Sequence, residues 1–217
     1  MEKEGEGRWV PAKEIFSITG AHFVPWLEMQ PATLLSICKR GKKLRGPSPW
    51  DWLRTFWGFP RREIGRKQIW RGSYFQKEIE SLYVSDVTLR WINPEIGWGV
   101  FARRNFKAGE YIAEYTGVVR KRKRSDEQNG YCFEYVHLSG EKTSFLIDAR
   151  ESGGISRYIN HSEEGNLEPK LATIGTVTHV LLLTKKSIQK GEQLCYDYGP
   201  AYWAHRPRPV SLERNFI

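Results

Sequence analysis

The sequence predicts a mainly β protein with some α-helix, in which a small, mostly helical N-terminal module precedes a β-rich domain. Three observations support this fold class. Short runs of β-branched and aromatic residues recur after residue 91, separated by turns rich in Gly, Asn and Ser. The first 70 residues instead hold six of the nine Trp, among Pro and Gly breakers. Long amphipathic helices are absent after residue 91, which disfavours a doubly wound α/β sheet.

Helices are expected in the N-terminal module, residues 1–89, which is basic and rich in Trp. Segments 31–40 and 49–57 each begin with Pro and then space apolar residues at helical intervals. Residues 76–91 are expected to form a third helix that runs into a strand. We expect the Trp of this module to be core and packing residues rather than a base-stacking platform, because such platforms usually lie on exposed strands.

Strands are expected throughout the second part of the chain, where each run of four to ten residues is rich in Val, Ile, Leu, Tyr or Phe. The expected strands include residues 99–102, 110–119, 131–136, 145–149, 178–184 and 193–198.

Composition excludes several classes of protein. No apolar run approaches the ~20 residues that a membrane-spanning helix needs, and the N-terminus lacks the apolar stretch of a Sec-type signal. We therefore expect a soluble protein without membrane contact. Cys38, Cys132 and Cys195 are isolated and odd in number, which argues against a disulfide framework and a cysteine-ligated zinc.

The net charge of +9 favours acidic partners such as nucleic acid. Positive charge is denser before residue 90 than after it. The basic run RKRKR at residues 120–124 leaves three interpretations open: a solvated loop, a nuclear-import signal, or a docking patch for nucleosomal DNA.

Four stretches of the β-rich part carry residues suited to binding and chemistry. GWGVFA at residues 97–102 begins a strand with two Gly, where a ligand can approach the backbone closely. AGEYIAEYTG at 108–117 is a strand with Gly near each end. RYINHS at 157–162, followed by GNL, supplies polar groups for an amino-acid-like ligand. GEQLCYDYG at 191–199 places two Tyr on one face of a strand.

In this order and spacing, the four motifs resemble those of the SET-domain protein lysine methyltransferases, over roughly residues 90–203. Within this family, the sequence most resembles the compact, zinc-free SET proteins of chlamydia-type bacteria. The resemblance implies a fold of several short curved sheets with a C-terminal pseudoknot, preceded by the N-terminal extension 1–89 and followed by a tail at 204–217.

The resemblance also implies S-adenosyl-L-methionine as the cofactor and assigns residues to it. Asn160 and His161 would contact the cofactor, and Arg157 would position this segment near the methionine carboxylate. The backbone around Trp98 would approach the amino-acid part, and Tyr202 or Trp203 would cover the adenine and close the lysine channel. The implied cofactor-binding residues are Gly97, Trp98, Gly99, Arg157, Asn160, His161 and Trp203.

Three tyrosines are the implied catalytic residues. Tyr198 matches the catalytic tyrosine of the family, whose hydroxyl orients the amine and the methyl group. Tyr196 holds the position that tunes the degree of methylation, so we expect mono- or dimethylation. Tyr131 is expected to line the lysine channel. Because the Cys-rich zinc clusters of many SET enzymes are missing from the sequence, we expect no metal.

The resulting hypothesis is a protein-lysine N-methyltransferase that acts on histones or bacterial histone-like proteins. Glu163, Glu164 and Glu168 are candidates to meet a basic tail, and a basic surface elsewhere suits indirect contact with DNA in chromatin. The expected setting is the bacterial cytoplasm, or, for an effector secreted without a Sec signal, a host cell and its nucleus. Two alternatives remain: a catalytically silent SET module that binds chromatin or nucleic acid, and a methyltransferase for a non-histone protein. The N-terminal extension is expected to serve homodimerisation, substrate docking or capping of the sheet.

Overall fold

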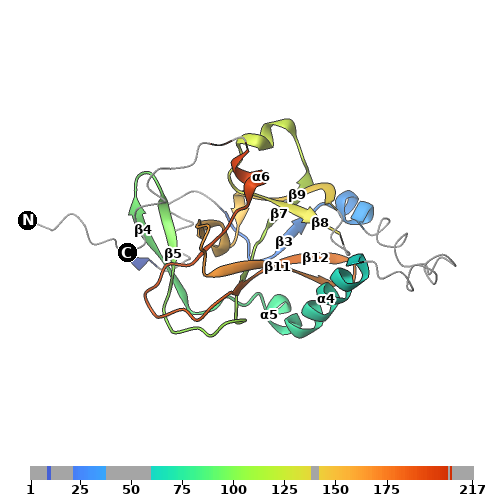
Figure 1. Cartoon of the computed structure of the whole chain (residues 1–217). Helices are drawn as coiled ribbons and strands as arrows, with labels where there is room; N and C mark the ends of the chain where they lie inside the picture. Colours follow the sequence, from blue (N-terminus) through green and yellow to red (C-terminus); the bar gives the residue numbers. More distant parts are fainter. Residues whose placement is uncertain (1–8, 11–21, 38–59, 138–141, 205, 207–217) are drawn as a thin grey trace, which may run out of the picture.

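The structure is a computed structural model that describes residues 9–10, 22–37, 60–137, 142–204 and 206 (Figure 1). The described strands form four small sheets, as expected for a mainly β protein. The first is antiparallel, with the order β1-β4-β5, and consists of β1 (Trp9–Val10), β4 (Val87–Asn93) and β5 (Gly97–Ala102).

The second sheet has the order β11-β12-β6 and forms the centre of the molecule (Figure 1). Strands β11 (Leu167–Ile174) and β12 (Val177–Thr184) form a hairpin that turns at Gly175, whose φ of 60° favours Gly. Strand β6 (Tyr111–Glu114) pairs with the buried end of β12. The last five residues of β12 are all buried, so this sheet is covered on both faces.

The third sheet has the order β2-β9-β7-β3, with one further strand on β9. Its long strand β9 (Lys142–Gly153) pairs antiparallel with β7 (Gly117–Lys121) and with β8 (Cys132–Val136). The short strands β2 (His22–Phe23) and β3 (Leu27–Met29) pair in parallel with β9 and β7. Residues of the N-terminal extension are thus built into the sheets of the domain that follows.

The fourth sheet brings together two of the motif segments. Strand β10 (Asn160–His161) pairs in parallel with β13 (Cys195–Tyr196), and Ser162 donates its N–H to the carbonyl of Tyr196. Asn166 stabilises the contact between the same two segments, because its side-chain amide donates to the carbonyl of Gln193 and accepts from the N–H of Cys195. Residues 160–166 therefore cross directly against 193–198.

Helices lie mainly in the N-terminal part, as expected, and the described ones partly match the predictions. Residues 31–37 are helical, within the predicted 31–40, and α5 (Gln76–Glu80) leads on to β4 as predicted. The helix predicted at 49–57 lies outside the described residues. Helix α4 (Pro60–Tyr74) was not predicted; it packs on β11, where Gly72 comes so close to the backbone of Thr173 that a side chain would collide with it.

The expectation that the N-terminal Trp pack in the core is wrong for the two whose side chains are described. Trp26 is 49% exposed and Trp70 is 58% exposed. Trp70 instead stacks on Tyr74 of the same helix, with ring centroids 5.0 Å apart. The main core lies under the motif segments, where Leu89, Ile112 and Leu194 are fully buried.

Three short helical segments complete the described fold. They are the 3-10 helices η1 (Arg124–Gln128) and η2 (Ile155–Tyr158) and the α-helical turn α6 (Pro200–Trp203). Within the described ranges, no helix has the length and apolar character needed to cross a membrane.

Candidate active site

A cavity of about 630 Å³ lies where the motif segments meet. Its walls come from the β4–β5 hairpin, the residues after η1, the segment from η2 to β10, and the residues from β13 to α6. The lining residues are Trp91, Ile96, Gly97, Trp98, Gly130, Tyr131, Arg157, Tyr158, Asn160, His161, Tyr198, Tyr202 and Trp203.

A second, much narrower cavity of about 40 Å³ adjoins the first. Its walls are mainly aromatic, and its lining residues are Tyr115, Gly130, Cys132, Phe133, Arg157, Tyr196, Tyr198 and Tyr202. Four residues line both cavities: Gly130, Arg157, Tyr198 and Tyr202. The site thus has a roomy compartment and a narrow one that meet at two tyrosines, an arginine and a glycine. Tyr131, which was expected to line the lysine channel, lines only the larger cavity.

Tyr198 is held rigidly at this junction. Its hydroxyl donates to the carbonyl of Ile159 at 2.7 Å, and its backbone N–H donates to Nδ1 of His161 at 3.1 Å. Burial, with smaller contributions from the neighbouring Tyr196 and Tyr202, raises the pKa of Tyr198 well above its ordinary value. Tyr198 is therefore a neutral phenol whose oxygen can still accept a hydrogen bond.

Tyr196 and Tyr115 line the narrow cavity but not the larger one. Tyr196 lies 4.8 Å from Tyr198 between ring centroids, and burial raises its pKa above the ordinary range. Tyr115 is also buried with a raised pKa, and its hydroxyl donates to the carbonyl of Tyr131 at 2.9 Å. Tyr115 belongs to the EYTG motif, yet its contribution to this cavity was not predicted.

Asn160 and His161 lie together on the wall of the larger cavity. Their contact with a cofactor, which the resemblance implies, stays a prediction. The Asn160 amide donates to the carbonyl of Trp98 at 3.2 Å, which leaves its Oδ1 available to accept a hydrogen bond. The His161 ring packs edge-on against Trp203, with centroids 4.8 Å apart. Because His161 Nδ1 accepts from Tyr198, the proton of the neutral ring lies on Nε2.

Arg157 is the cation shared by the two cavities. Its guanidinium lies 4.4 Å from the centroid of the Tyr131 ring, close enough for a cation–π contact. Its Nε and NH1 atoms are buried and have no hydrogen-bond partner among the described residues. Two buried, unsatisfied donors carry a free-energy cost, so this side chain is suited to an anionic ligand group.

Gly97 and Trp98 line the larger cavity, whereas Gly99 does not. A Cβ at Gly99 would approach Nδ2 of Asn160 to 3.2 Å and Nε2 of Gln193 to 2.9 Å. The nearest atom would be Cδ1 of Ile92 at 2.6 Å, so the space beside this glycine accommodates the side chains of Ile92, Gln193 and Asn160. Trp91, 41% exposed and 5.4 Å from Trp98 between ring centroids, also lines the cavity and was not predicted, since only the β4–β5 pairing places it there.

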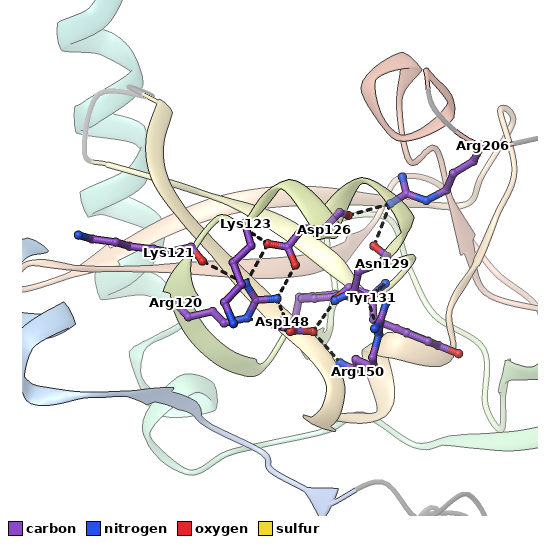
Figure 2. A network of polar contacts seen from close by, with 10 residues as sticks. Arg120, Lys121, Lys123, Asp126, Asn129, Tyr131, Asp148, Arg150 and Arg206 are labelled. Carbon is purple, nitrogen blue, oxygen red and sulfur yellow. Dashed lines mark hydrogen bonds and ion pairs between the residues drawn. The ribbon is translucent and has the colours of Figure 1, made fainter.

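The loop that carries Gly130 and Tyr131 is held by a network of ion pairs and hydrogen bonds (Figure 2). Arg120 donates to the carboxylates of Asp126 and Asp148, with shortest distances of 2.6 Å to each. The Asn129 amide donates to Asp148, and its oxygen accepts from the N–H of Tyr131. Arg120, the first residue of the basic run, is therefore structural rather than solvated.

Two of the three cysteines lie in the described part of the chain. Cys132 and Cys195 are free thiols, and burial raises the pKa of each to about 12. Cys38 lies outside the described residues. No group of three or more His, Cys, Asp or Glu with metal-binding arrangement occurs in the described segments. The absence of a metal in the working protein remains a prediction.

Comparison with known proteins finds a matching family model and several relatives that this chain resembles. Residues 97–199 match the SET domain. N-lysine methyltransferase KMT5A-A of Xenopus laevis is 40% identical over 116 residues, which are 48% of this chain and 33% of that protein. KMT5A-A of Danio rerio is 32% identical over 154 residues, 65% of this chain and 44% of that protein. Histone-lysine N-methyltransferase Set8 of Drosophila melanogaster is 37% identical over 112 residues, 48% of this chain and 16% of that protein.

The chain therefore spans less than half the length of these curated relatives. Among solved structures, the polycomb repressive complex 2 called ctPRC2, in an autoinhibited conformation bound to S-adenosylmethionine, matches with a TM-score of 0.48 and 26% identity. That match covers 58% of this chain and 17% of the other. The expected likeness to compact bacterial SET proteins is not tested by these relatives and stays a prediction.

Proposed function

We propose that this chain, whose residues 97–199 match the SET domain, is a protein-lysine N-methyltransferase that uses S-adenosyl-L-methionine. One observation carries the proposal: a roomy cavity and a narrow aromatic cavity meet at the rigidly held Tyr198. Such a junction allows a methyl donor and a lysine side chain to enter separate compartments and to meet end to end. Alignment of two reactants in this way contributes ~7–11 kcal/mol to lowering a reaction barrier.

The larger cavity fits the proposed cofactor. Its volume of about 630 Å³ is within the range of roughly 300–1,000 Å³ common for small-molecule sites. Arg157 offers two buried N–H donors that suit a carboxylate, and the oxygen of Asn160 suits an amine. The aromatic faces of Trp98 and Trp203 suit a flat base. When bound, S-adenosyl-L-methionine supplies a methyl group on a positively charged sulfur.

The narrow cavity suits a lysine side chain that must lose its proton. A lysine amine has a pKa of ~10.4 in water, and burial between aromatic rings lowers that pKa because it disfavours the charged form. The Arg157 cation on the same wall acts in the same direction. The lining residues include no carboxylate or imidazole, so the proton leaves to water and Tyr198 acts by orienting the neutral amine.

Tyr196 limits the number of methyl groups transferred in this proposal. Its hydroxyl takes up space in a cavity of only about 40 Å³ and can hold the amine or a water by a hydrogen bond. We expect mono- or dimethylation as the main outcome. Mass spectrometry of a peptide with a single lysine tests this expectation, and rapid, predominant trimethylation would contradict it.

Histones or histone-like basic proteins are the proposed substrates, supported by the name of the Drosophila melanogaster relative, histone-lysine N-methyltransferase Set8. Glu163 and Glu164 are exposed and remain candidates to meet a basic tail. Glu168 forms an ion pair with Lys170 at 2.7 Å, which makes it a weaker candidate. In the basic run, Arg122 forms an ion pair with Glu134. The other exposed cations of the run, Lys121, Lys123 and Arg124, are suited to indirect contact with DNA phosphates.

The broader setting of the enzyme also remains a prediction. A bacterial cytoplasm, or a host nucleus reached without a Sec signal, is the setting expected from the bacterial resemblance. Homodimerisation through residues 1–89 is a further prediction, which analytical ultracentrifugation of the chain would test.

The proposed function is tested by methyl transfer from radiolabelled S-adenosyl-L-methionine to core histones and to a bacterial histone-like protein. Tyr198→Phe removes the hydroxyl at the junction and is expected to reduce transfer by roughly 10²-fold or more. Tyr74→Phe removes an equivalent hydroxyl from an exposed residue of α4 and should leave transfer unchanged. If the wild type binds no S-adenosyl-L-methionine in calorimetry, the enzyme proposal fails and a silent chromatin-binding module takes its place.

A further inference from the structure

Arg206 connects the two sides of the active-site junction and has no role in the function proposed above. It follows α6, which carries Tyr202 and Trp203. Its NH1 group donates to the carbonyl of Tyr202 at 2.7 Å. Its NH2 group reaches across to the loop after η1 and donates to the carbonyl of Asn129 at 2.9 Å and that of Asp126 at 3.4 Å (Figure 2).

The loop side of this connection is fixed independently of Arg206. Asp126 receives two hydrogen bonds from Arg120, at 2.6 and 2.9 Å, and one from the N–H of Lys123. Asn129 is held by its contact with Asp148. Arg206 therefore connects α6 by hydrogen bonds to two backbone carbonyl groups. The contacts of Arg120, Asp126 and Asp148 already determine the positions of these carbonyl groups.

Tyr202 is the residue of α6 that this connection controls most directly. Besides the hydrogen bond to its carbonyl, the Arg206 guanidinium lies 4.2 Å from the centroid of its ring. The Tyr202 hydroxyl is so near Gly130 that a Cβ there would come within 3.0 Å of it. The Tyr202 ring also packs edge-on against Tyr198, with centroids 4.6 Å apart.

We propose that Arg206 is a positioning residue that fixes Tyr202 between the two cavities, so that Tyr202 closes the narrow compartment against Gly130 and Tyr198. Tyr202 lines both cavities, so its position sets the width of their junction and the fit of the lysine side chain. The consequence for substrate rests on the proposed function, whereas the positioning itself does not.

The chemistry of the contact requires arginine. A planar guanidinium donates in two directions within its plane and stacks on a ring with its face at the same time. A lysine ammonium at this position can satisfy one of the carbonyl groups but does not reproduce the planar contact with the Tyr202 ring. Arg206→Lys is therefore expected to behave like Arg206→Ala and not like the wild type.

The first test follows the Tyr202 ring itself. A fluorotyrosine placed at position 202 gives one ¹⁹F resonance that reports the environment of the ring. Arg206→Ala and Arg206→Lys are expected to shift and broaden this resonance. Arg104→Ala is the matched control, because Arg104 also lies over an aromatic ring, 3.9 Å from the centroid of Phe106, and lines neither cavity. It should leave the resonance unchanged.

The second test is a double-mutant cycle on kcat/KM for a histone-tail peptide. Each single variant, Arg206→Ala and Tyr202→Ala, is expected to lower kcat/KM by about 10- to 100-fold. The double variant should lose no more than Tyr202→Ala alone, because Arg206 acts through that ring. A multiplicative loss, or a ¹⁹F resonance unchanged in Arg206→Ala, overturns the proposal. If the wild type transfers no methyl group, the proposed function fails, and the ¹⁹F spectrum alone decides whether Arg206 positions Tyr202.

Discussion

An alanine at position 165 is expected to disturb the crossing of residues 160–166 against 193–198 and, with it, the active site. A Cβ on Gly165 would lie 2.6 Å from the carbonyl oxygen of Cys195 and 2.6 Å from the Cα of Tyr196. Non-bonded carbon atoms pack at ~3.5–4.0 Å, so the two segments would have to separate by roughly 1 Å. Both contacts are with backbone, which cannot move aside as a flexible side chain does.

The size of the effect follows from this displacement. Overpacking of this kind costs ~1–3 kcal/mol. In a protein of this size each kcal/mol lowers Tm by ~2–4 °C, so Tm should fall by about 2–12 °C. The displaced segment carries Tyr196 and Tyr198, and a misplacement of ~1 Å at a reacting group costs about 10²-fold in rate. Gly165→Ala should therefore lose both stability and methyl transfer.

Differential scanning calorimetry and a methyl-transfer assay measure the two effects. Glu164→Ala, a change at the exposed neighbouring position, is the control for stability; its free energy of unfolding should stay within about 0.5 kcal/mol of the wild type. If Gly165→Ala has the same Tm as Glu164→Ala, the two segments do not touch as described, and the explanation of how the tyrosines are held is wrong.

Three further results are expected. Gly72→Ala should lower the free energy of unfolding in urea by ~1–3 kcal/mol, because the new methyl group collides with the Thr173 backbone where α4 packs on β11. Ser73→Ala, at the exposed neighbouring position, should change the free energy of unfolding little. Methyl transfer should rise from about pH 7 to about pH 10, because the lysine amine loses its proton over this range. The raised pKa of Tyr198 keeps its phenol neutral throughout the same range. A decline in methyl transfer that begins below about pH 9, while the protein is still folded, would be inconsistent with a neutral Tyr198. Arg120 lowers the pKa of Asp126 from 3.8 to about 2, so its carboxylate adds stability that is present above the unfolded pKa and lost as pH falls through the folded one. Asp126→Asn should thus cost about 1–2 kcal/mol at neutral pH and reduce the fall of Tm between about pH 4 and 2, and an unchanged acid transition would argue against the ion pair.

Local sequence patterns could predict the segments that carry the site. Asn160, His161 and Tyr198 belong to short motifs that can be recognised locally. That the three residues share one site was implied by the family resemblance of the motif series, and all three line the larger cavity. The strands were recognisable because alternation and β-branched residues act over a few positions.

Features that depend on distant contacts could not be predicted in the same way. Trp91 reaches the cavity only through pairing of β4 with β5, and Tyr115 resembles any other tyrosine of a buried strand. Arg206 contacts Asn129 across 77 positions of sequence. Helix α4 has two glycines, Gly65 and Gly72, and no clear apolar face, so its formation depends on packing against β11.

The central claim is that methyl donor and lysine enter separate cavities that meet at Tyr198. A crystal structure of the protein with S-adenosylhomocysteine and a lysine peptide tests it most directly. The expected result places the cofactor product in the cavity lined by Trp98, Asn160 and Trp203, and the lysine amine in the narrow cavity beside Tyr196, with the Tyr198 hydroxyl between them. A cofactor product bound outside the larger cavity, or a lysine that does not enter the narrow one, would contradict the claim.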